Sequence, residues 1–274
     1  MGRLVWLASY PKSGNTWLRL LLHNFVLQPE SPFDINRLDA FSTSEDMARH
    51  FRRLDPRPAT EYTAAEVQRM RPLVHRALRD GRDGVVFVKT HNAAVSVGGV
   101  PLVTPDATWG AVVVVRDPRD VAVSYSHHFA VGVDEAIGIM EREDATTGGT
   151  ETRVLGWPGS WSLHVASWTA QASPRVHVMR YEDLVADTVA AAGGMIRFFG
   201  LEVPEARLAR AVAASRFEVA QAQERRSGFV EHPPGRGAFF RQGRAGGWRE
   251  VLTPAQAGRV EAAHGVQMAR HGYL

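Results

Sequence analysis

The sequence predicts an α/β protein folded as one domain. Short apolar runs typical of buried strands alternate along the chain with segments of helical periodicity. A chain of 274 residues with 45% hydrophobic content can bury one substantial core, and α/β folds of this size are commonly a single domain. We therefore expect one domain over residues 1–274.

The composition excludes several kinds of protein. The chain has no cysteine, which excludes disulfides and thiolate metal sites. Its formal net charge is only +3, so nucleic-acid binding is not required. No apolar run approaches the roughly 18 residues of a membrane span, and the start lacks a signal-peptide layout. We expect a cytoplasmic protein without a membrane segment.

The first strand, residues 4–8, leads into a loop with the parts of a phosphate cradle. Gly14 lets the backbone approach a ligand, and the first N–H groups of the next helix point outward at the positive end of its dipole. Lys12 adds a full charge. Short hydrogen-bonding side chains occupy three further positions, Ser13, Asn15 and Thr16. The alternative is an ordinary strand-to-helix turn, in which these side chains cap the helix.

The spacing of this loop differs from the triphosphatase pattern Gly-x-x-x-x-Gly-Lys-Ser/Thr, because Lys12 precedes Gly14. The segment from Tyr10 to Trp17 instead resembles the 5′-phosphosulfate loop of sulfotransferases that use 3′-phosphoadenosine 5′-phosphosulfate (PAPS). The family's usual Thr is Asn15 here, whose amide can still offer a hydrogen bond. The resemblance implies a P-loop-like phosphosulfate-binding loop that includes Trp17.

Lysine is kept at only two positions. Of the 32 basic residues, all except Lys12 and Lys89 are arginines. A compact ammonium and a planar guanidinium are not equivalent beside a reacting phosphate or sulfate oxygen. One lysine lies in the loop and the other lies two residues before His91. Chance is therefore the weaker explanation for the positions of the two lysines.

His91 follows the second predicted strand, residues 85–88, which comes after a predicted helix over residues 64–79. Functional groups collect at the carboxyl ends of parallel strands, and the neighbouring Lys89 favours a neutral imidazole that can accept a proton. A structural histidine is the alternative. Residues 89–91 resemble the sulfotransferase segment whose His is the general base. The resulting catalytic candidates are His91, Lys12 and Lys89.

Arg116 directly follows the third apolar run, where a magnesium-dependent phosphotransferase would place an acid. A guanidinium suits bidentate recognition of a phosphate. By itself, the segment is also compatible with a salt bridge from Arg116 to Asp117 or Asp120. It resembles the family's 3′-phosphate motif, which implies that Arg116 and Ser124 contact that phosphate.

Three later segments extend the resemblance. Tyr181 follows a fourth strand, residues 176–180, where the family's Tyr contacts the adenine; packing at a sheet edge is the alternative. Ser215 lies where the family has a hydroxyl that touches the nucleotide, although a helix N-cap explains it equally well. Residues 240–249 resemble the C-terminal signature Arg-Lys-Gly-x-x-Gly-x-Trp, whose first three positions are Arg241, Gln242 and Gly243.

This signature departs from the family at two positions. Gln242 replaces the Lys, so one cation for the 3′-phosphate is missing, and Arg244 is a candidate replacement. Gly247 replaces the acid before Trp248, which removes a possible clamp on the loop. These departures bear on the affinity for the cofactor rather than on its identity.

Three segments are candidates for the wall of an acceptor pocket. In residues 28–63, four aromatic side chains either line the pocket or, as we favour, anchor a long connection: Phe33, Phe41, Phe51 and Tyr62. Residues 131–158 contain acidic, Thr- and Gly-rich material and form either a mobile lid or an exposed insertion. Residues 225–247 form a loop over the active face.

Helical periodicity also predicts helices over residues 159–172 and 189–223, and from 253 to 264 or 268.

The resemblance extends over nearly the whole chain, since the motifs occur in the family's order. It implies a single α/β domain whose central parallel sheet is flanked by helices. The implied reaction moves the sulfuryl group of PAPS to a hydroxyl of a small-molecule acceptor by in-line displacement and leaves adenosine 3′,5′-bisphosphate (PAP), without a metal ion. The nearest type within the family is the bacterial small-molecule sulfotransferase of secondary metabolism.

Two alternatives stay open at this point. A metal-dependent kinase of nucleotides or small molecules also needs a phosphate cradle, but the loop spacing and Arg116 disfavour it. A non-catalytic module that binds adenosine bisphosphate or another anion would keep the arginines and make His91 unnecessary. A homodimer is equally open. The sulfotransferase interpretation requires Lys12, His91 and Arg116 to share one cavity wide enough for a nucleotide.

Overall fold

The computed structural model describes residues 2–170, 173, 175–232 and 237–274. Its strands are β1 (Arg3–Ser9), β2 (Thr43–Ser44), β3 (Val85–Thr90), β4 (Ser96–Val97), β5 (Val100–Pro101), β6 (Thr108–Val115) and β7 (Val176–Arg180). Its α-helices are α1 (Asn15–Leu27), α2 (Ala48–Phe51), α3 (Ala64–Asp80), α4 (Pro118–Phe129), α5 (Val133–Glu141), α6 (Trp161–Thr169), α7 (Tyr181–Ala186), α8 (Thr188–Phe198), α9 (Glu205–Ala214), α10 (Phe217–Ser227) and α11 (Pro254–Arg270). Short 3₁₀ helices are η1 (Ile35–Ala40), η2 (Ala59–Glu61), η3 (Pro105–Ala107) and η4 (Gly247–Glu250).

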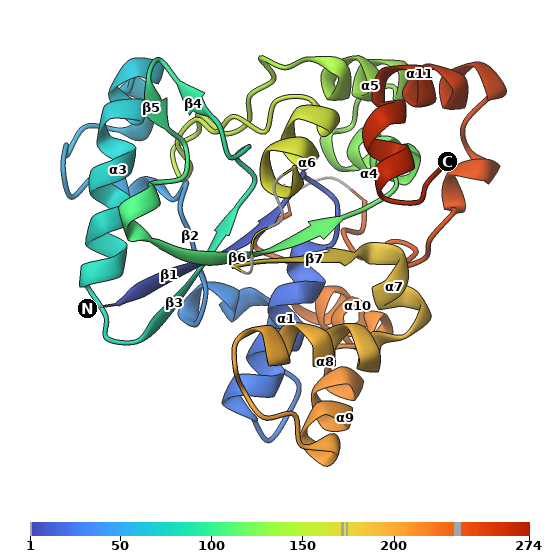
Figure 1. Cartoon of the computed structure of the whole chain (residues 1–274), viewed down its shortest axis with the longest axis horizontal. Coiled ribbons are helices and arrows are strands. Elements are labelled where there is room, and N and C mark those ends of the chain that lie inside the picture. The colour runs from blue at the N-terminus through green and yellow to red at the C-terminus, as the bar shows by residue number, and fades with distance from the viewer. Residues whose placement is uncertain (1, 171–172, 174, 233–236) are drawn as a thin grey trace.

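In the described part of the chain, a five-stranded parallel sheet in the order β2-β3-β1-β6-β7 forms the centre of the molecule (Figure 1). β1 lies in the middle of the sheet, where a strand with a continuous apolar run is buried on both faces. Because the strands are parallel, their carboxyl ends lie along one edge of the sheet. The prediction of a single α/β domain with a central parallel sheet flanked by helices is confirmed.

Alternate side chains of β1 pack on opposite faces of the sheet. Val5 and Leu7 belong to a buried cluster with α1, α8 and α9, whereas Leu4, Trp6 and Ala8 belong to a cluster with α4, α5, α6 and α11. Figure 1 shows these two sets of helices on opposite sides of the sheet. The two layers cover both faces of the sheet, so the loops at its carboxyl edge start from a packed core.

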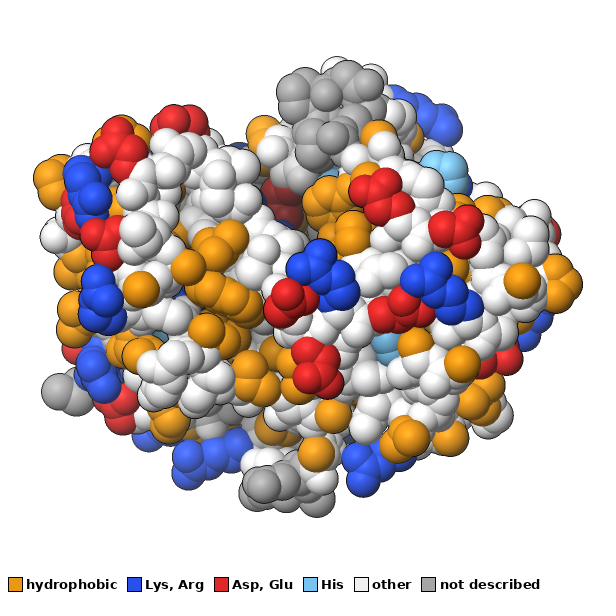
Figure 2. All heavy atoms as spheres, turned by 90° about the horizontal axis from the view of Figure 1, so that it is seen from above, with side chains coloured by type: hydrophobic (Ala, Val, Ile, Leu, Met, Phe, Trp, Pro, Cys, Tyr) orange, Lys and Arg blue, Asp and Glu red, His pale blue; other side chains and the backbone are white. Residues whose placement is uncertain are grey.

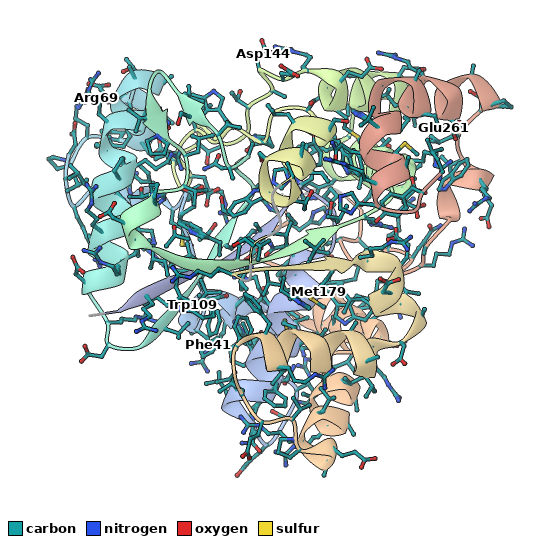
Figure 3. All side chains as sticks on the ribbon, in the orientation of Figure 1. Phe41, Arg69, Trp109, Asp144, Met179 and Glu261 are labelled. Atoms are coloured by element: carbon teal, nitrogen blue, oxygen red, sulfur yellow. The ribbon has the colours of Figure 1, made fainter. Side chains whose placement is uncertain are left out.

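The aromatic side chains of residues 28–63 are anchors, as we favoured. Phe51 is fully buried beside α3, and Phe33, Phe41 and Tyr62 each pack against a different buried cluster. Figure 3 shows Phe41 on the α1 and α8 side of the sheet together with Trp109 and Met179, while Arg69, Asp144 and Glu261 lie at the periphery.

Several elements differ from those predicted. The 131–158 segment contains α5, whose Ala136, Ile137 and Met140 are fully buried against α4 and α11, so this part is not an exposed insertion. The predicted helix over residues 159–172 is α6, which ends at Thr169; residues 171–172 lie outside the described ones. β2 and the β4–β5 hairpin were not predicted, because two-residue strands carry no periodicity.

No helix within the described ranges combines the length and the apolar character that a bilayer-spanning segment needs. The face in Figure 2 carries acidic and basic side chains side by side, so neither sign of charge dominates there.

Candidate active site

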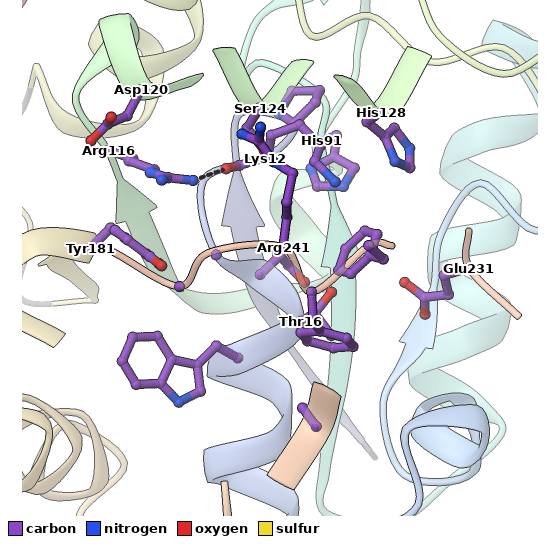
Figure 4. A pocket seen from close by; sticks show the side chains of 18 of the residues that line it. Lys12, Thr16, His91, Arg116, Asp120, Ser124, His128, Tyr181, Glu231 and Arg241 are labelled. Atoms are coloured by element: carbon purple, nitrogen blue, oxygen red, sulfur yellow. Dashed lines mark hydrogen bonds between the residues drawn. The ribbon is translucent and has the colours of Figure 1, made fainter. Parts of the chain in front are cut away.

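The strands of the sheet end at a cavity of about 470 Å³ (Figure 4). The segments after β1, β3 and β6 contribute Lys12, His91 and Arg116 to its wall, so the shared cavity that the sequence interpretation requires is present. All the predicted site residues except Ser13 line it: Lys12, Gly14, Asn15, Thr16, Trp17, Lys89, His91, Arg116, Ser124, Tyr181, Ser215, Arg241, Gln242 and Gly243.

The loop between β1 and α1 is shaped by Gly14, the N-cap residue of α1. Gly14 has φ 107°, in the region that disfavours a side chain, and a Cβ there would lie 2.8 Å from Cδ2 of Tyr181. Lys12 also has a positive φ of 69°, a strained conformation for a residue with a side chain. The start of α1 is thereby exposed to the cavity, as a phosphate cradle requires.

Two side chains of the loop are oriented differently from our expectation. Nδ2 of Asn15 donates to the carbonyl of Leu7 at 2.8 Å and to Oγ of Ser9 at 3.3 Å. The amide N–H groups of Asn15 therefore tie the loop to β1 and do not face a ligand. Ser13 is only 1% exposed, and its Oγ has no hydrogen-bond partner among the described residues. Asn15 lies in the first turn of α1, where Cα–Cβ bonds tilt toward the start of the helix, so its amide reaches back to β1.

Lys12 lies beside an aromatic ring and other cations. Its Nζ is 3.8 Å from the ring centroid of Phe239, a cation–π distance. Burial, followed by the charges of Arg116 and Lys89, lowers the pKa of Lys12 to about 7. An anion bound in the cavity would favour the protonated form and raise this pKa again.

His91 is held in one tautomer. Its Nδ1 lies 2.7 Å from the carbonyl oxygen of Ser9, so Nδ1 carries the proton and donates it to this bond. Nε2 then has a free lone pair. Burial, followed by the charge of Lys89, lowers the pKa of His91 well below the usual 6.5. A neutral imidazole with an unprotonated Nε2 is what a general base needs.

Both neighbours of His91 are fixed by a buried carboxylate that sequence reasoning missed. Oε1 of Glu45 accepts a hydrogen bond from Nδ2 of Asn92 at 2.5 Å and one from Oγ1 of Thr90 at 3.3 Å. Oδ1 of Asn92 accepts from the backbone N–H of Trp157 at 2.6 Å. The turn that carries His91 is thus bound to Glu45, which directly follows β2, and to Trp157 of the 131–158 segment.

Lys89 forms an ion pair that the sequence did not predict. Its Nζ lies 2.8 Å from Oε2 of Glu231, and Oε1 of the same carboxylate lies 2.5 Å from Nη1 of Arg19. All three side chains are largely buried. Glu231 lies in the Gly-, Pro- and Arg-rich 225–247 segment, where no motif indicates this contact. The pair fixes the Lys89 ammonium close to His91.

Arg116 binds main-chain oxygens. Its Nη1 donates to the carbonyl of Lys12 at 3.1 Å and its Nη2 to that of Arg244 at 3.2 Å. Nε is buried with no partner among the described residues, and the guanidinium stacks 4.2 Å from the centroid of the Tyr181 ring. The alternative salt bridge is wrong, since Asp117 pairs with Arg119 and Asp120 binds backbone N–H groups of another loop.

Asp120 supplies the clamp on the C-terminal loop that Gly247 cannot supply. Its Oδ2 accepts from the N–H of Gly246 at 2.7 Å and its Oδ1 from that of Trp248 at 2.8 Å. Arg244, the candidate replacement for the missing lysine, lines the cavity but pairs with Glu250. Its charge is therefore already shared with a carboxylate.

Aromatic and hydroxyl groups form the far end of the cavity. The rings of Trp17 and Tyr181 meet edge to face with centroids 5.8 Å apart, and Nε1 of Trp17 has no partner among the described residues. Ser215 is the C-cap of α9, so the N-cap alternative is wrong. Its Oγ donates to the carbonyl of Ala211 at 2.8 Å and accepts from Nδ2 of Asn24 at 3.0 Å.

Comparison with known proteins identifies the family. A family model for the sulfotransferase domain matches residues 3–272. The chain belongs to the sulfotransferase domain family. Among the described residues, no group of three or more His, Asp or Glu side chains is arranged to hold a metal ion.

The chain is similar to several named sulfotransferases, at low sequence identity. The chain is 24% identical to Sulfotransferase 1A1 of Canis lupus familiaris over 96% of this chain and 82% of that protein. It is 26% identical to Cytosolic sulfotransferase 17 of Arabidopsis thaliana, over 97% of this chain and 74% of the relative. The match to Sulfotransferase 6B1 of Danio rerio, at 25% identity, covers 58% of this chain and about half, 51%, of that protein.

Solved sulfotransferase structures share the fold. Retinol dehydratase in complex with androsterone and inactive cofactor PAP superposes with a TM-score of 0.64 at 20% identity, over 97% of this chain and 80% of that chain. Mouse sulfotransferase SULT7A1 complexed with PAP gives a TM-score of 0.63 at 18% identity, over 97% of this chain and 84% of that chain.

Proposed function

We propose that this chain is a PAPS-dependent sulfotransferase that moves a sulfuryl group to a hydroxyl of a small-molecule acceptor and leaves PAP. The supporting observation is the meeting of Lys12, His91 and Arg116 in one cavity at the carboxyl edge of the sheet. The sulfotransferase family, and the PAP held by structural neighbours of the same fold, agree with this proposal.

The cavity fits an anionic nucleotide. Its wall carries a glycine that leaves the start of α1 open, a cluster of cations, and two buried donors without partners among the described residues, Nε of Arg116 and Nε1 of Trp17. We assign the 5′-phosphosulfate to the loop of Lys12, Ser13, Gly14, Asn15 and Thr16, with Ser13 and Asn15 acting through their backbone. We assign the 3′-phosphate to Arg116, Ser124, Arg241, Gln242 and Gly243, and the nucleoside to Trp17, Tyr181 and Ser215.

The side chains around His91 suit the chemistry. When bound, PAPS supplies an activated sulfuryl group. Nε2 of His91 would take the proton of the acceptor hydroxyl, because Nδ1 is committed to the Ser9 carbonyl. Lys12 would carry its proton in the loaded site and neutralise the charge on the leaving oxygen. Lys89, fixed by Glu231, would orient the sulfonyl oxygens or the acceptor.

A binding scan followed by product analysis tests this function. We expect the protein to bind PAP more tightly than ATP, and mass spectrometry to find a sulfated product when PAPS is supplied with a library of hydroxyl compounds. Activity that strictly requires magnesium and ATP would instead identify a kinase. Tight binding of PAP without turnover of any acceptor would identify a binding module. The cytoplasmic location and the homodimer stay predictions, for fractionation and light scattering to check.

A further inference from the structure

The order of the strands sets the order of the cavity-lining groups along the carboxyl edge of the sheet. Along the carboxyl edge, β7 leads to Tyr181, β6 to Arg116, β1 to Lys12, β3 to His91 and β2 to Asp46. Neighbouring strands lie ~4.8 Å apart, so these groups form a row. If the nucleotide spans β7 to β1, as the proposed function requires, the acceptor hydroxyl lies at β3. The body of the acceptor then lies over β2.

An ion pair with unused hydrogen-bonding atoms lies at the β2 end of this row. Nη1 of Arg153 is 2.7 Å from Oδ1 of Asp46, and the same oxygen accepts from Oγ of Ser44 at 2.6 Å. The described residues give no hydrogen bond to Oδ2 of Asp46 or to Nε and Nη2 of Arg153. Both side chains line the cavity and are about a quarter exposed, Asp46 at 23% and Arg153 at 27%.

The 131–158 segment extends this polar wall. Thr147, Gly148 and Thr150 line the cavity next to Arg153. The backbone of this segment is held by an isolated bridge between Met47 and Arg153. This part of the wall therefore offers both hydrogen-bond donors and acceptors, and it is tied to the edge of the sheet.

We propose that Asp46 and Arg153 form an acceptor subsite that takes a polyhydroxylated compound, such as a sugar or a glycoside. This inference rests on the proposed function. Neighbouring hydroxyl groups both donate and accept, so they satisfy Oδ2 of Asp46 and the free N–H groups of Arg153 together. An apolar alcohol has one hydroxyl, which His91 would engage. Its carbon skeleton would cover the ion pair and leave those polar atoms without partners, which is unfavourable.

The first test is a divided panel of acceptors supplied with PAPS. The polyhydroxylated half contains methyl glucosides, 4-nitrophenyl glucoside and nucleosides, and the single-hydroxyl half contains androsterone, retinol and 4-nitrophenol. We expect kcat/KM for the best polyhydroxylated acceptor to exceed that for every single-hydroxyl compound at least ~10-fold, because a site built for hydrogen bonds rejects ligands that lack them.

The second test uses variants of the subsite. We expect Arg153→Met and Asp46→Asn to lower kcat/KM for the best polyhydroxylated acceptor by about 10- to 100-fold, mainly through KM, since each removes hydrogen bonds to a charged group. Calorimetry on PAP-saturated enzyme should show the same loss of acceptor binding, with the Kd of PAP unchanged. Arg153→Lys keeps a charge without the planar fork and should give an intermediate loss of kcat/KM. It replaces Arg153→Met in this test if the Met variant does not fold.

Arg142→Met is the matched control. Arg142 belongs to the same 131–158 segment and pairs with Asp144 at 2.9 Å, but it lies outside the cavity wall. It should leave the acceptor kinetics unchanged. If single-hydroxyl compounds are the better acceptors, or if Arg153→Met behaves like Arg142→Met, the subsite is refuted while the proposed function stands. If no acceptor of either half is sulfated although PAP binds, both are refuted.

Discussion

His91 owes its proposed role to a single hydrogen bond that leaves one nitrogen available. The Ser9 carbonyl holds the proton on Nδ1, so Nε2 is left unprotonated. We expect His91→Ala to lower kcat by ~10²–10⁴, the usual contribution of a general base. The Kd of PAP, measured by calorimetry, should be unchanged, because we assign no nucleotide contact to this side chain. A kcat close to the wild-type value would contradict the general-base assignment.

The pH dependence of the same side chain is a separate prediction. Burial and the charge of Lys89 lower the pKa of His91, and the active form is the neutral one. Proton acceptance is therefore available above the lowered pKa and is lost only when the pH falls through it. We expect the acid limb of a kcat/KM profile to lie well below pH 6.5. Because kcat/KM reports the ionisation of the free enzyme, an acid limb at 6.5 would mean that His91 is not the base.

Lys12 should take up a proton when the nucleotide binds. Its pKa is about 7 in the free protein, so at pH 8 most molecules carry a neutral amine. Bound phosphates favour the ammonium and raise the pKa, whereas PAP itself is already ionised at this pH. Calorimetry of PAP binding at pH 8, in buffers that differ in ionisation enthalpy, should report an uptake of nearly one proton. At pH 6 the uptake should vanish. Lys12→Arg, which is always charged, should abolish the uptake at pH 8.

At the scale of elements, the turn after β3 is held by a buried carboxylate. Glu45 is balanced by the guanidinium of Arg71 and binds Asn92, which in turn binds Trp157. Asn92→Ala leaves the Trp157 N–H without its partner, at a cost of roughly 1–3 kcal/mol in the free energy of unfolding, and leaves Oε1 of Glu45 with only the 3.3 Å bond from Thr90. It also frees the turn that positions His91. We expect kcat to fall ~10- to 100-fold with the Kd of PAP unchanged.

The control for Asn92→Ala is Thr104→Val, at a residue that is connected to Glu45 through His75. Nδ1 of His75 is 2.8 Å from Oγ1 of Thr104, and Nε2 of His75 is 3.6 Å from Oε2 of Glu45. Thr104→Val removes a buried hydrogen bond without touching the turn. It should lower the melting temperature and spare kcat. Equal losses of kcat in both variants would show that general destabilisation, and not the position of His91, explains the effect.

Patterns within one segment could be predicted from the sequence, and contacts between distant segments could not. β1, β3, β6 and β7 were predicted because each contains a short, mainly apolar run, and the residues at the carboxyl ends of parallel strands had to meet. The pair Lys89–Glu231 joins residues 142 positions apart, and Asn92–Glu45 joins residues 47 apart. The inward amide of Asn15 was missed for a related reason, since its partner atoms on β1 depend on how the loop folds back.

At the scale of the whole molecule, the segment after β6 connects the two ends of the chain. Arg116 binds the carbonyl of Lys12 near the start and that of Arg244 near the end, while Asp120 binds the N–H groups of Gly246 and Trp248. A ligand in the cavity therefore touches segments from the first strand to the last loop. Its binding free energy should add to the stability of the entire domain.

This coupling predicts how nucleotides change thermal stability. PAP at 100 times its Kd should stabilise the folded state by about 2.7 kcal/mol, which corresponds to a rise of ~5 °C in Tm for a chain of this size. Adenosine 5′-monophosphate lacks the 3′-phosphate and, at the same concentration, should raise Tm less. Arg116→Ala should remove most of the difference between the two ligands, because the 3′-phosphate loses its guanidinium partner. Differential scanning calorimetry measures all four shifts. If the variant keeps the full advantage of PAP, Arg116 does not hold the 3′-phosphate, and its two main-chain bonds are its whole contribution.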